Sequence, residues 1–313
     1  MIKSPKISII IPVYNGVEFL DSCIKGVFNQ TFCDYEVLLI NDGSTDGSLA
    51  RCYDYAKIDT RVRVISSEKN RGVSYSRQIG VDMSRGEYTI HVDVDDKIEP
   101  SMLEEMYNYA KGNNLDILIT DYYVNSDLYI EQSLSFSTNR DIVKSILTGK
   151  TLGSMWNKLV KTSLYKEKKV SFPKGVNYCE DVFVIISLLL HEDISIGFLK
   201  KAYYHYFINP KSITNFPNIK TINGRILFVG LLSEVLLQNN VSTDLLNWHK
   251  IDIKYSMFKT GLFPYSEFKK IFPEVFPECL IYNYSPKRKR FAVFFISINK
   301  FLWIITRCMN KYV

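Results

Sequence analysis

Three familiar sequence patterns are missing from this chain of 313 residues. Its six cysteines form no C-x-x-C pair, and no G-x-G-x-x-G stretch is present. There is also no run of about 20 mainly apolar residues, the length that a membrane-spanning helix needs. Scattered cysteines do not match a zinc site or a disulfide framework, so we expect reduced thiols in a cytoplasmic protein. The first residues lack an apolar segment with a cleavage site, so we expect no secretion signal.

The positive charge of the chain is concentrated at one end. The net charge is +6, but residues 287–313 contain seven lysines and arginines and no acidic residue. The remaining residues, with 32 basic and 33 acidic side chains, are nearly neutral, so we expect no nucleic-acid binding. Residues 286–313 are basic and amphipathic, which favours an interfacial helix on an anionic membrane surface. Packing of this tail on the rest of the protein, or contact with a partner protein, are the alternatives.

Strands and helices are predicted to alternate along the first third of the chain. Apolar, β-branched runs indicate strands at 6–12, 35–40, 61–65, 88–92 and 115–120. Helical spacing of apolar residues occupies 18–29, 48–57 and 74–83 between the first four strands. This order predicts an α/β fold with a mostly parallel sheet and helices on both faces. Residues 125–140 are polar and are predicted to be a loop, and 225–238 form an apolar helix.

Polar residues follow each of the first four predicted strands, at 12–15, 41–44, 66–72 and 93–96. Ligands of open parallel sheets bind at the carboxyl ends of the strands, so four such ends suggest a polar ligand. The last group contains Asp93, Asp95 and Asp96. Carboxylates this close repel one another unless a cation or hydrogen-bond donors offset them. The simpler alternative is a polar turn before a helix that begins near Pro100.

Three other segments are candidates for binding or catalysis, and each has a structural alternative. Residues 41–48 could meet a phosphate with their N–H groups, and Asp42 could accept the N–H of a base, or they form a capped loop. In 70–77, Gly72 would permit close backbone approach and an arginine could bind a diphosphate, or the segment is an ordinary surface helix. Glu180 and Asp181 could be reactive, or they compensate a helix dipole.

The ordered set of these segments resembles family-2 glycosyltransferases of the GT-A fold, of the bacterial polysaccharide type. The matching stretches are ISIIIPVYNG (7–16), FNQTFCDYEVLLINDGSTDGS (28–48), NRGVSYSRQIG (70–80), GEYTIHVDVDD (86–96), WNKL (156–159) and ED (180–181). The resemblance implies a GT-A domain at 1–215, with a nucleotide-sugar half at 1–125 and an acceptor half at 126–215. A helical extension would follow at 216–285, before the basic tail at 286–313.

The resemblance also assigns roles to residues. Asp93-Val94-Asp95 would be the D-x-D motif, in which Asp95 binds Mn²⁺ or Mg²⁺, Asp93 faces the sugar or ribose, and Asp96 positions the site. Asp181 would be the general base of an inverting transfer from a nucleotide-diphosphate sugar, most simply a UDP-sugar, to a hydroxyl of a glycan or lipid-linked glycan. The other residues expected to bind substrate or nucleotide are Pro12, Tyr14, Asn15, Asp42, Asn70, Gly72, Arg77, Trp156, Lys158 and Glu180.

The sequence departs from the family pattern at Gln78, where relatives often have asparagine, and at Val94, where they often have a small polar residue. One alternative function is an inactive GT-A domain that serves as a scaffold in glycan assembly, although a scaffold would not need Asp95 and Asp181. Another is a nucleotidyltransferase, which should carry a glycine-rich, basic loop where this chain has PVYNGVEF. We expect a protein that acts in cell-surface polysaccharide synthesis at the cytoplasmic face of the membrane.

Overall fold

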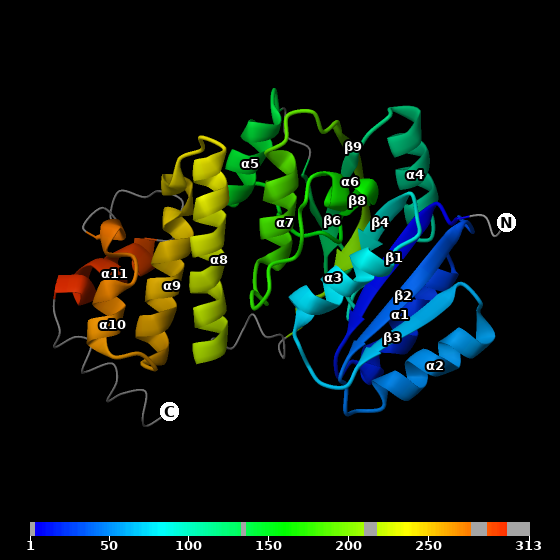
Figure 1. Ribbon diagram of the computed structural model, residues 1–313, viewed down its shortest axis with the longest axis horizontal. Coiled ribbons are helices and arrows are strands. Elements are labelled where there is room, and N and C mark those ends of the chain that lie inside the picture. Colours follow the sequence, from blue (N-terminus) through cyan, green and yellow to red (C-terminus); the bar gives the residue numbers. More distant parts are fainter. Residues whose placement is uncertain (1–3, 133–135, 210–217, 277–286, 299–313) are drawn as a thin grey trace. The chain divides into compact units, whose positions relative to one another are not determined.

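The computed structural model describes residues 4–132, 136–209, 218–276 and 287–298, and contains two compact units (Figure 1). The first, here called the α/β unit, comprises Met1–Val143, Leu152–Gly175 and Glu180–Asn209. The second, called the helical unit, comprises Lys144–Thr151, Val176–Cys179 and Pro210–Val313. Each unit is described separately.

A single mixed sheet forms the centre of the α/β unit, with strand order β3-β2-β1-β4-β8-β6-β9-β5 and β7 paired to β6. The neighbours β3, β2, β1 and β4 are all parallel, whereas β8 is antiparallel to both β4 and β6. The mostly parallel α/β fold predicted from the sequence is therefore confirmed. The strands are β1 (Ile7–Val13), β2 (Tyr35–Asp42), β3 (Val62–Ser67), β4 (Tyr88–His91), β5 (Lys97–Ile98), β6 (Ile117–Val124), β7 (Leu128–Ile130), β8 (Lys158–Lys161) and β9 (Ile196–Tyr206).

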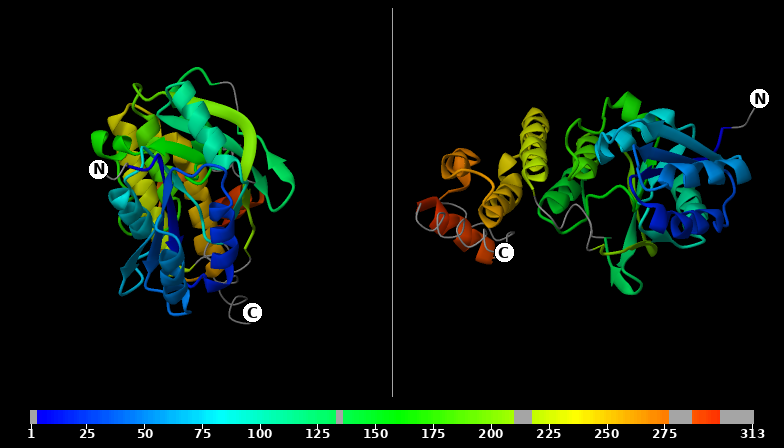
Figure 2. Two further views of the ribbon diagram at one scale, coloured as in Figure 1. Left: turned by 90° about the vertical axis from the view of Figure 1, so that its right-hand side faces the viewer. Right: turned by 90° about the horizontal axis from the view of Figure 1, so that it is seen from below.

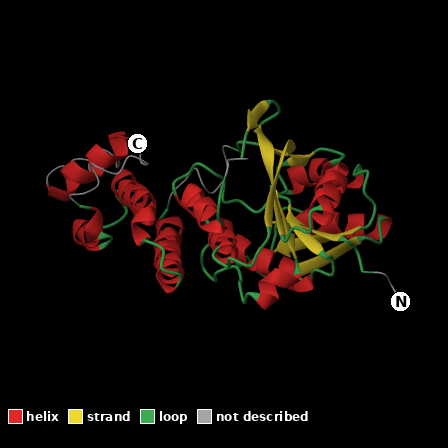
Figure 3. Cartoon of the chain, turned by 90° about the horizontal axis from the view of Figure 1, so that it is seen from above, coloured by secondary structure: helices red, strands yellow, loops and turns green. Residues whose placement is uncertain are grey.

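Helices cover both faces of this sheet, as the almost completely buried strands β1 and β2 require (Figure 3). Alternate residues such as Ile9 and Val37 pack in one core cluster with α1 (Val17–Phe28), α2 (Ser48–Ile58) and α4 (Met102–Gly112). Ile10 points to the other face, where α3 (Val73–Met83) lies close. A Cβ atom at Gly80 of α3 would lie 2.3 Å from Ile10, so only glycine allows this approach.

The second half of the α/β unit differs from the prediction. Residues 125–140 are not one loop, because they include β7 and the start of α5 (Asn139–Leu147). Strands β5, β8 and β9 are not predicted by the sequence; β9, yellow-green in Figure 2, is long and bent, and its pairing with β6 shifts register near Asp121. Its exposure does not alternate regularly, so period-2 patterning is absent. The remaining helices are α6 (Ser163–Glu167) and α7 (Glu180–Leu189).

The helical unit contains α8 (Ile219–Gln238), α9 (Asn247–Thr260), α10 (Tyr265–Lys270) and α11 (Lys287–Ile298), with 3₁₀ turns at Thr243–Leu246 and Pro273–Val275. Val293 of α11 is fully buried with Ile251 and Val275. Lys289 and Arg225 both form ion pairs with Asp252. The described part of the basic tail thus packs within the helical unit, which is the alternative to membrane docking. Residues 299–313 lie outside the described residues. No described helix is both long and apolar enough to cross a membrane.

Candidate active site

The three aspartates that follow β4 form a tight turn, here called the acidic turn (Asp93–Asp96). The backbone N–H of Asp96 donates to the carbonyl oxygen of Asp93 at 3.1 Å. A Cβ atom at Gly16 would lie 3.0 Å from Val94, so the loop after β1 packs closely on the turn. The position that is often small and polar in relatives is here an apolar packing contact.

Residues at and after the end of β9 hold the acidic turn by hydrogen bonds. The two carboxylate oxygens of Asp96 accept from the Tyr204 hydroxyl at 2.7 Å and from the Phe207 backbone N–H at 2.8 Å. The side-chain amide of Asn209 donates to Asp95 at 3.0 Å. Burial, together with the charge of Asp93, raises the pKa of Asp96 to about 8. The sequence signal for these partners is weak, because the tyrosines of 203–206 are most simply explained as packing residues.

Arg77 connects the acidic turn to the start of α7. Its side chain is 6% exposed, and Nη2 donates to Asp93 at 2.9 Å. Nη1 lies 3.1 Å from Glu180 and 3.5 Å from Asp181. Burial lowers the pKa of Arg77, but the three carboxylates outweigh this effect and raise it overall. The structure therefore brings together four residues that the sequence analysis singled out separately.

The acidic pair at the start of α7 is held in a low-dielectric setting. Burial raises the pKa of both Glu180 and Asp181, and the positive charge of Arg77 opposes this rise. The Glu180 side chain is 6% exposed and that of Asp181 is 17% exposed. Asp181 is therefore the more accessible carboxylate of the pair.

The loops after β1 and β2 are tied together by side chains of the 41–48 segment. The side chains of Ser44, Ser48 and Asp46 accept hydrogen bonds from the backbone N–H groups of residues 15, 16 and 17, at 3.0, 3.1 and 3.0 Å respectively. In return, the side-chain oxygen of Asn15 accepts from the N–H of Thr45 at 2.8 Å. These hydrogen bonds join the loop after β2 to the loop after β1 at the start of α1. Tyr14, next to Asn15, is 49% exposed.

Asp42 holds the loop that contains Asn70 and Gly72. Its two carboxylate oxygens accept the backbone N–H groups of Arg71 at 2.9 Å and Gly72 at 2.7 Å. Gly72 has φ +98°, in the region that favours glycine. Gly43 has φ +67°, and a Cβ atom there would lie 2.5 Å from the backbone of Lys69. The predicted base-binding residue thus has a structural task, and only its remaining lone pairs are available to a ligand.

Trp156 and Lys158 lie in the loop before β8 and at its start. The Lys158 ammonium is fully buried and donates to the carbonyl oxygens of Leu152 and Ser154 and to the Asn157 side chain, at 2.7–2.8 Å. Burial lowers the pKa of Lys158 to about 7, and the charge of Asp181 opposes this shift. Trp156 is 5% exposed and stacks on Tyr204. Both side chains stabilise the loop before β8, and both are too buried to contact a substrate in this structure.

The metal expected at Asp95 fits the chemistry of the acidic turn. Burial and the neighbouring charge of Asp93 raise the pKa of Asp95, and a divalent cation would relieve both effects. Among the residues described, no group of three or more His, Cys, Asp or Glu side chains forms a metal cluster. Mg²⁺ at phosphate sites typically uses one or two carboxylates with waters and substrate phosphates, so Asp95 can serve without such a cluster.

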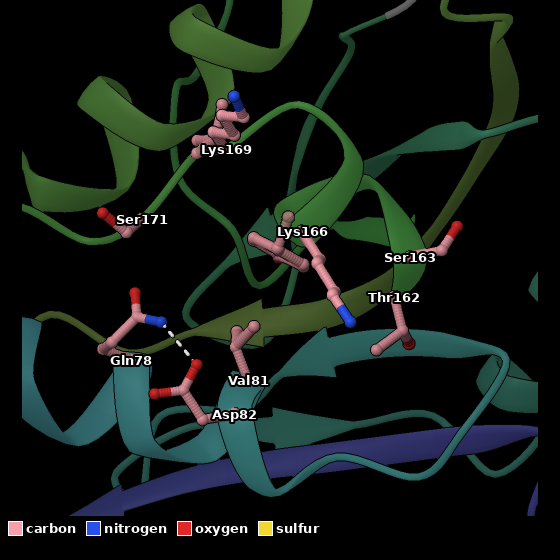
Figure 4. Close-up of a pocket in the computed structure, with 10 residues that line it drawn as sticks. Gln78, Val81, Asp82, Thr162, Ser163, Lys166, Lys169 and Ser171 are labelled. Atoms are coloured by element: carbon pink, nitrogen blue, oxygen red, sulfur yellow. Dashed lines mark hydrogen bonds between the residues drawn. The ribbon is translucent and has the colours of Figure 1, made fainter.

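A cavity of about 540 Å³ lies beside α3 and α6 (Figure 4), and its lining includes none of the residues predicted for the donor or the base. Gln78 is on its wall, where its side chain donates to Asp82 at 2.7 Å and accepts from the Phe172 N–H at 2.8 Å. The Gln78 side chain, at a position where relatives often have asparagine, therefore holds the backbone of Phe172 in place. The lining residues are Gln78, Val81, Asp82, Thr162, Ser163, Tyr165, Lys166, Lys169, Val170 and Ser171.

Comparison with known proteins decides the family. The pattern of glycosyl transferase family 2 matches residues 8–167, about half of the chain, including β1, the acidic turn and Arg77. The chain belongs to glycosyl transferase family 2. The resemblance predicted from the sequence is confirmed, and the protein is a glycosyltransferase.

Relatives and a solved structure agree with this family. EpsH of Bacillus subtilis is 31% identical over 248 residues, which cover 76% of this chain and 71% of EpsH. The poly(ribitol-phosphate) β-glucosyltransferase of Bacillus spizizenii is 35% identical over 209 residues, covering 64% of this chain and 32% of that enzyme. The fold is similar to that of S. aureus TarS residues 1–349 in complex with UDP-GlcNAc, with a TM-score of 0.63 and 19% identity. That match covers 97% of this chain and 89% of the TarS chain.

Proposed function

We propose that this family-2 enzyme transfers a sugar from a UDP-linked donor to a hydroxyl of a glycan or lipid-linked glycan, with inversion, in cell-surface polymer synthesis. The observation that carries the proposal is the Arg77 cluster, which joins a D-x-D carboxylate to the acidic pair of α7. The donor class is supported by TarS, solved with UDP-GlcNAc, and a hydroxyl-bearing polymer as acceptor is supported by the relative named for poly(ribitol-phosphate).

Asp181 is the proposed general base of this reaction. It takes the proton of the acceptor hydroxyl as that oxygen attacks C1, on the face opposite the leaving diphosphate, so the anomeric configuration inverts. Arg77 holds Asp181 beside the turn and opposes the burial that would otherwise protonate it. Proton removal by a positioned carboxylate typically contributes about 10²–10⁴-fold to the rate. Glu180 pairs with the same guanidinium and would hold it between Asp93 and Asp181.

The donor is proposed to lie over the loops after β1, β2 and β3. Tyr14 is exposed and would contact the base, Asp42 is buried and would reach it only through its remaining lone pairs, and Gly72 permits close approach of the backbone. Asp95 would hold the divalent cation, with Asn209 fixing its orientation. When bound, Mn²⁺ or Mg²⁺ offsets the negative charge that develops on the leaving diphosphate.

Membrane contact is a separate part of the proposal. We infer action at the cytoplasmic face, where a lipid-linked acceptor would be within reach. The buried position of Val293 argues that the described part of the tail contributes to folding, so membrane contact would have to use other residues.

Nucleotide release from a panel of UDP- and dTDP-linked sugars tests the proposal. The full chain is assayed with Mn²⁺ or Mg²⁺ and again with EDTA. We expect one donor to respond and the chelator to suppress the response. Asp95→Ala should abolish the metal response, whereas the matched control Asp127→Ala, at an exposed turn between β6 and β7, should retain it. Donor turnover that ignores both the chelator and Asp95→Ala would remove the metal assignment.

A further inference from the structure

The hydroxyl of Tyr204 joins the two ends of the acidic turn. It donates to the Asp96 carboxylate at 2.7 Å and accepts the backbone N–H of Asp93 at 3.0 Å. Tyr204 is fully buried, where an unpaired hydroxyl would be costly, and both of these hydrogen bonds satisfy it. Burial and the charges of Asp96 and Asp93 raise the pKa of Tyr204 well above its usual value, so the hydroxyl keeps its proton.

The ring of Tyr204 is itself fixed by the loop before β8. Its centroid lies 4.4 Å from that of Trp156, with 17° between the two planes. The Trp156 loop is closed in turn by the Lys158 ammonium, which donates to the carbonyl oxygens of Leu152 and Ser154. A continuous set of contacts therefore runs from Lys158 through the stacked rings to the acidic turn. The WNK segment, expected at the acceptor side, supports the donor side through Tyr204.

We propose that Tyr204 is a positioning residue of the acidic turn, which sets the direction of the Asp95 carboxylate for a divalent cation bound with a nucleoside diphosphate. The inference rests on the proposed function, because the cation is part of that proposal. Asp95 lies between the two residues that share the Tyr204 hydroxyl, so fixing both limits the orientations open to its backbone. The Asn209 amide then orients the carboxylate itself.

Tyr203 provides a matched control at the neighbouring position. It is 1% exposed, and its hydroxyl also donates to a carboxylate, that of Glu105 at 2.8 Å. Glu105 belongs to α4, so this bond ties β9 to a helix and does not touch the acidic turn. Tyr203→Phe and Tyr204→Phe therefore remove the same atom from two neighbouring tyrosines whose side chains are both buried. A general loss of stability should affect both variants, whereas loss of positioning should affect Tyr204→Phe alone.

Hydrogen–deuterium exchange of the full-length variants tests the structural part without any ligand. Peptides covering residues 92–97 should exchange at least about fivefold faster in Tyr204→Phe than in wild type, because the Asp93 N–H loses its acceptor. The same peptides should be unchanged in Tyr203→Phe. Equal protection of 92–97 in Tyr204→Phe and wild type would overturn the proposal. Trp156→Phe, which keeps the hydroxyl but weakens the stack, should give a smaller increase and serves if Tyr204→Phe does not fold.

Calorimetric titration with UDP, in Mn²⁺ and in EDTA, tests the functional part. We expect wild type, Tyr203→Phe and Tyr204→Phe to bind UDP equally in EDTA. The gain in UDP affinity on adding Mn²⁺ should be about tenfold smaller in Tyr204→Phe than in the other two proteins. A merely structural role would lower both affinities together. A full Mn²⁺ gain in Tyr204→Phe would overturn the positioning role. If wild type itself gains nothing from Mn²⁺, the proposed metal site fails, and the exchange experiment still decides whether Tyr204 fixes the turn.

Discussion

Arg77 Nη1 and the Asp181 carboxylate are 3.5 Å apart, and the other terminal nitrogen of the same guanidinium donates to Asp93. One buried cation is therefore shared by the acidic turn and by the proposed base. The arrangement makes the charge state of α7 depend on a residue of α3. We therefore expect a substitution of Arg77 to alter both the rate of proton transfer and the affinity for the donor.

Replacing Arg77 should change the pH dependence of catalysis. Burial raises the pKa of Asp181 above its ordinary value and Arg77 lowers it, so Arg77→Met should raise this pKa further. The acid limb of the pH profile of kcat/KM, measured with the responsive donor, should move to higher pH. Arg77→Lys keeps the charge and should move it less. An acid limb at the same pH in all three proteins would contradict this role.

Asp181→Asn should retain donor affinity and lose transfer. Removing a general base is expected to lower kcat by at least about 10²-fold, while UDP binding by calorimetry stays within about twofold of wild type. Asp127→Asn is the matched control, because it makes the same change at an exposed turn. Transfer near the wild-type rate in Asp181→Asn would place the base elsewhere, and Glu180→Gln would then be the next variant.

Asp95→Asn should weaken binding of a paramagnetic ion. Electron paramagnetic resonance of Mn²⁺ with UDP reports the bound fraction directly, without turnover. We expect at least about a tenfold loss of Mn²⁺ affinity, since a neutral amide is a poorer ligand of a hard cation than a carboxylate. Wild-type affinity in this variant would mean that another oxygen ligand holds the ion.

His91 should make the α/β unit sensitive to acid. Its imidazole is fully buried near Arg77, and among the described residues neither ring nitrogen has a hydrogen-bond partner. Burial, with the charge of Arg77, holds its pKa well below the usual value. The unfolded chain therefore binds a proton that the folded protein does not, and stability falls as pH drops below about 6.5, by up to about 1.4 kcal/mol per pH unit.

Thermal unfolding at pH 7.5 and pH 5 measures this effect. His91→Phe, which keeps a ring beside Phe172, should lose less stability between the two pH values than wild type. His191→Phe is the control, since His191 is only partly buried. The same acid-induced loss in His91→Phe and wild type would assign the sensitivity to other groups.

Truncation after Pro286 should destabilise the helical unit. It removes Val293 from the cluster with Ile251 and Val275, and it removes the Lys289 partner of Asp252. Val293→Ala should give a milder loss, about 1–3 kcal/mol in the free energy of unfolding. Chemical denaturation followed by far-ultraviolet circular dichroism measures both. Unchanged stability in the truncated protein would favour the membrane alternative, which liposome flotation then tests.

The sequence predicts the first half of the α/β unit well, because strands such as β1 and β2 contain continuous apolar runs. It also identifies Asp93, Arg77 and Asp181 as separate candidates. It does not predict that Lys158 is a buried support or that Asp42 holds a loop, because both depend on backbone groups brought close only by the fold. The sequence also does not predict that Tyr204 and Asn209 contact the acidic turn. β9 shows no regular alternation of buried and exposed residues, and it pairs with a strand far away in sequence.

Because residues in and after β9 fix the acidic turn, the turn can be completed only late in the synthesis of the chain. Asp93 leaves the ribosome more than a hundred residues before Tyr204 and Asn209, the side chains that fix its turn. A nascent chain that ends near residue 125 would contain every strand of the parallel β3-β2-β1-β4 group, yet its aspartates would lack their β9 partners. The predicted nucleotide-sugar half therefore lacks the contacts that fix its aspartates, and these contacts form only when β9 joins the sheet.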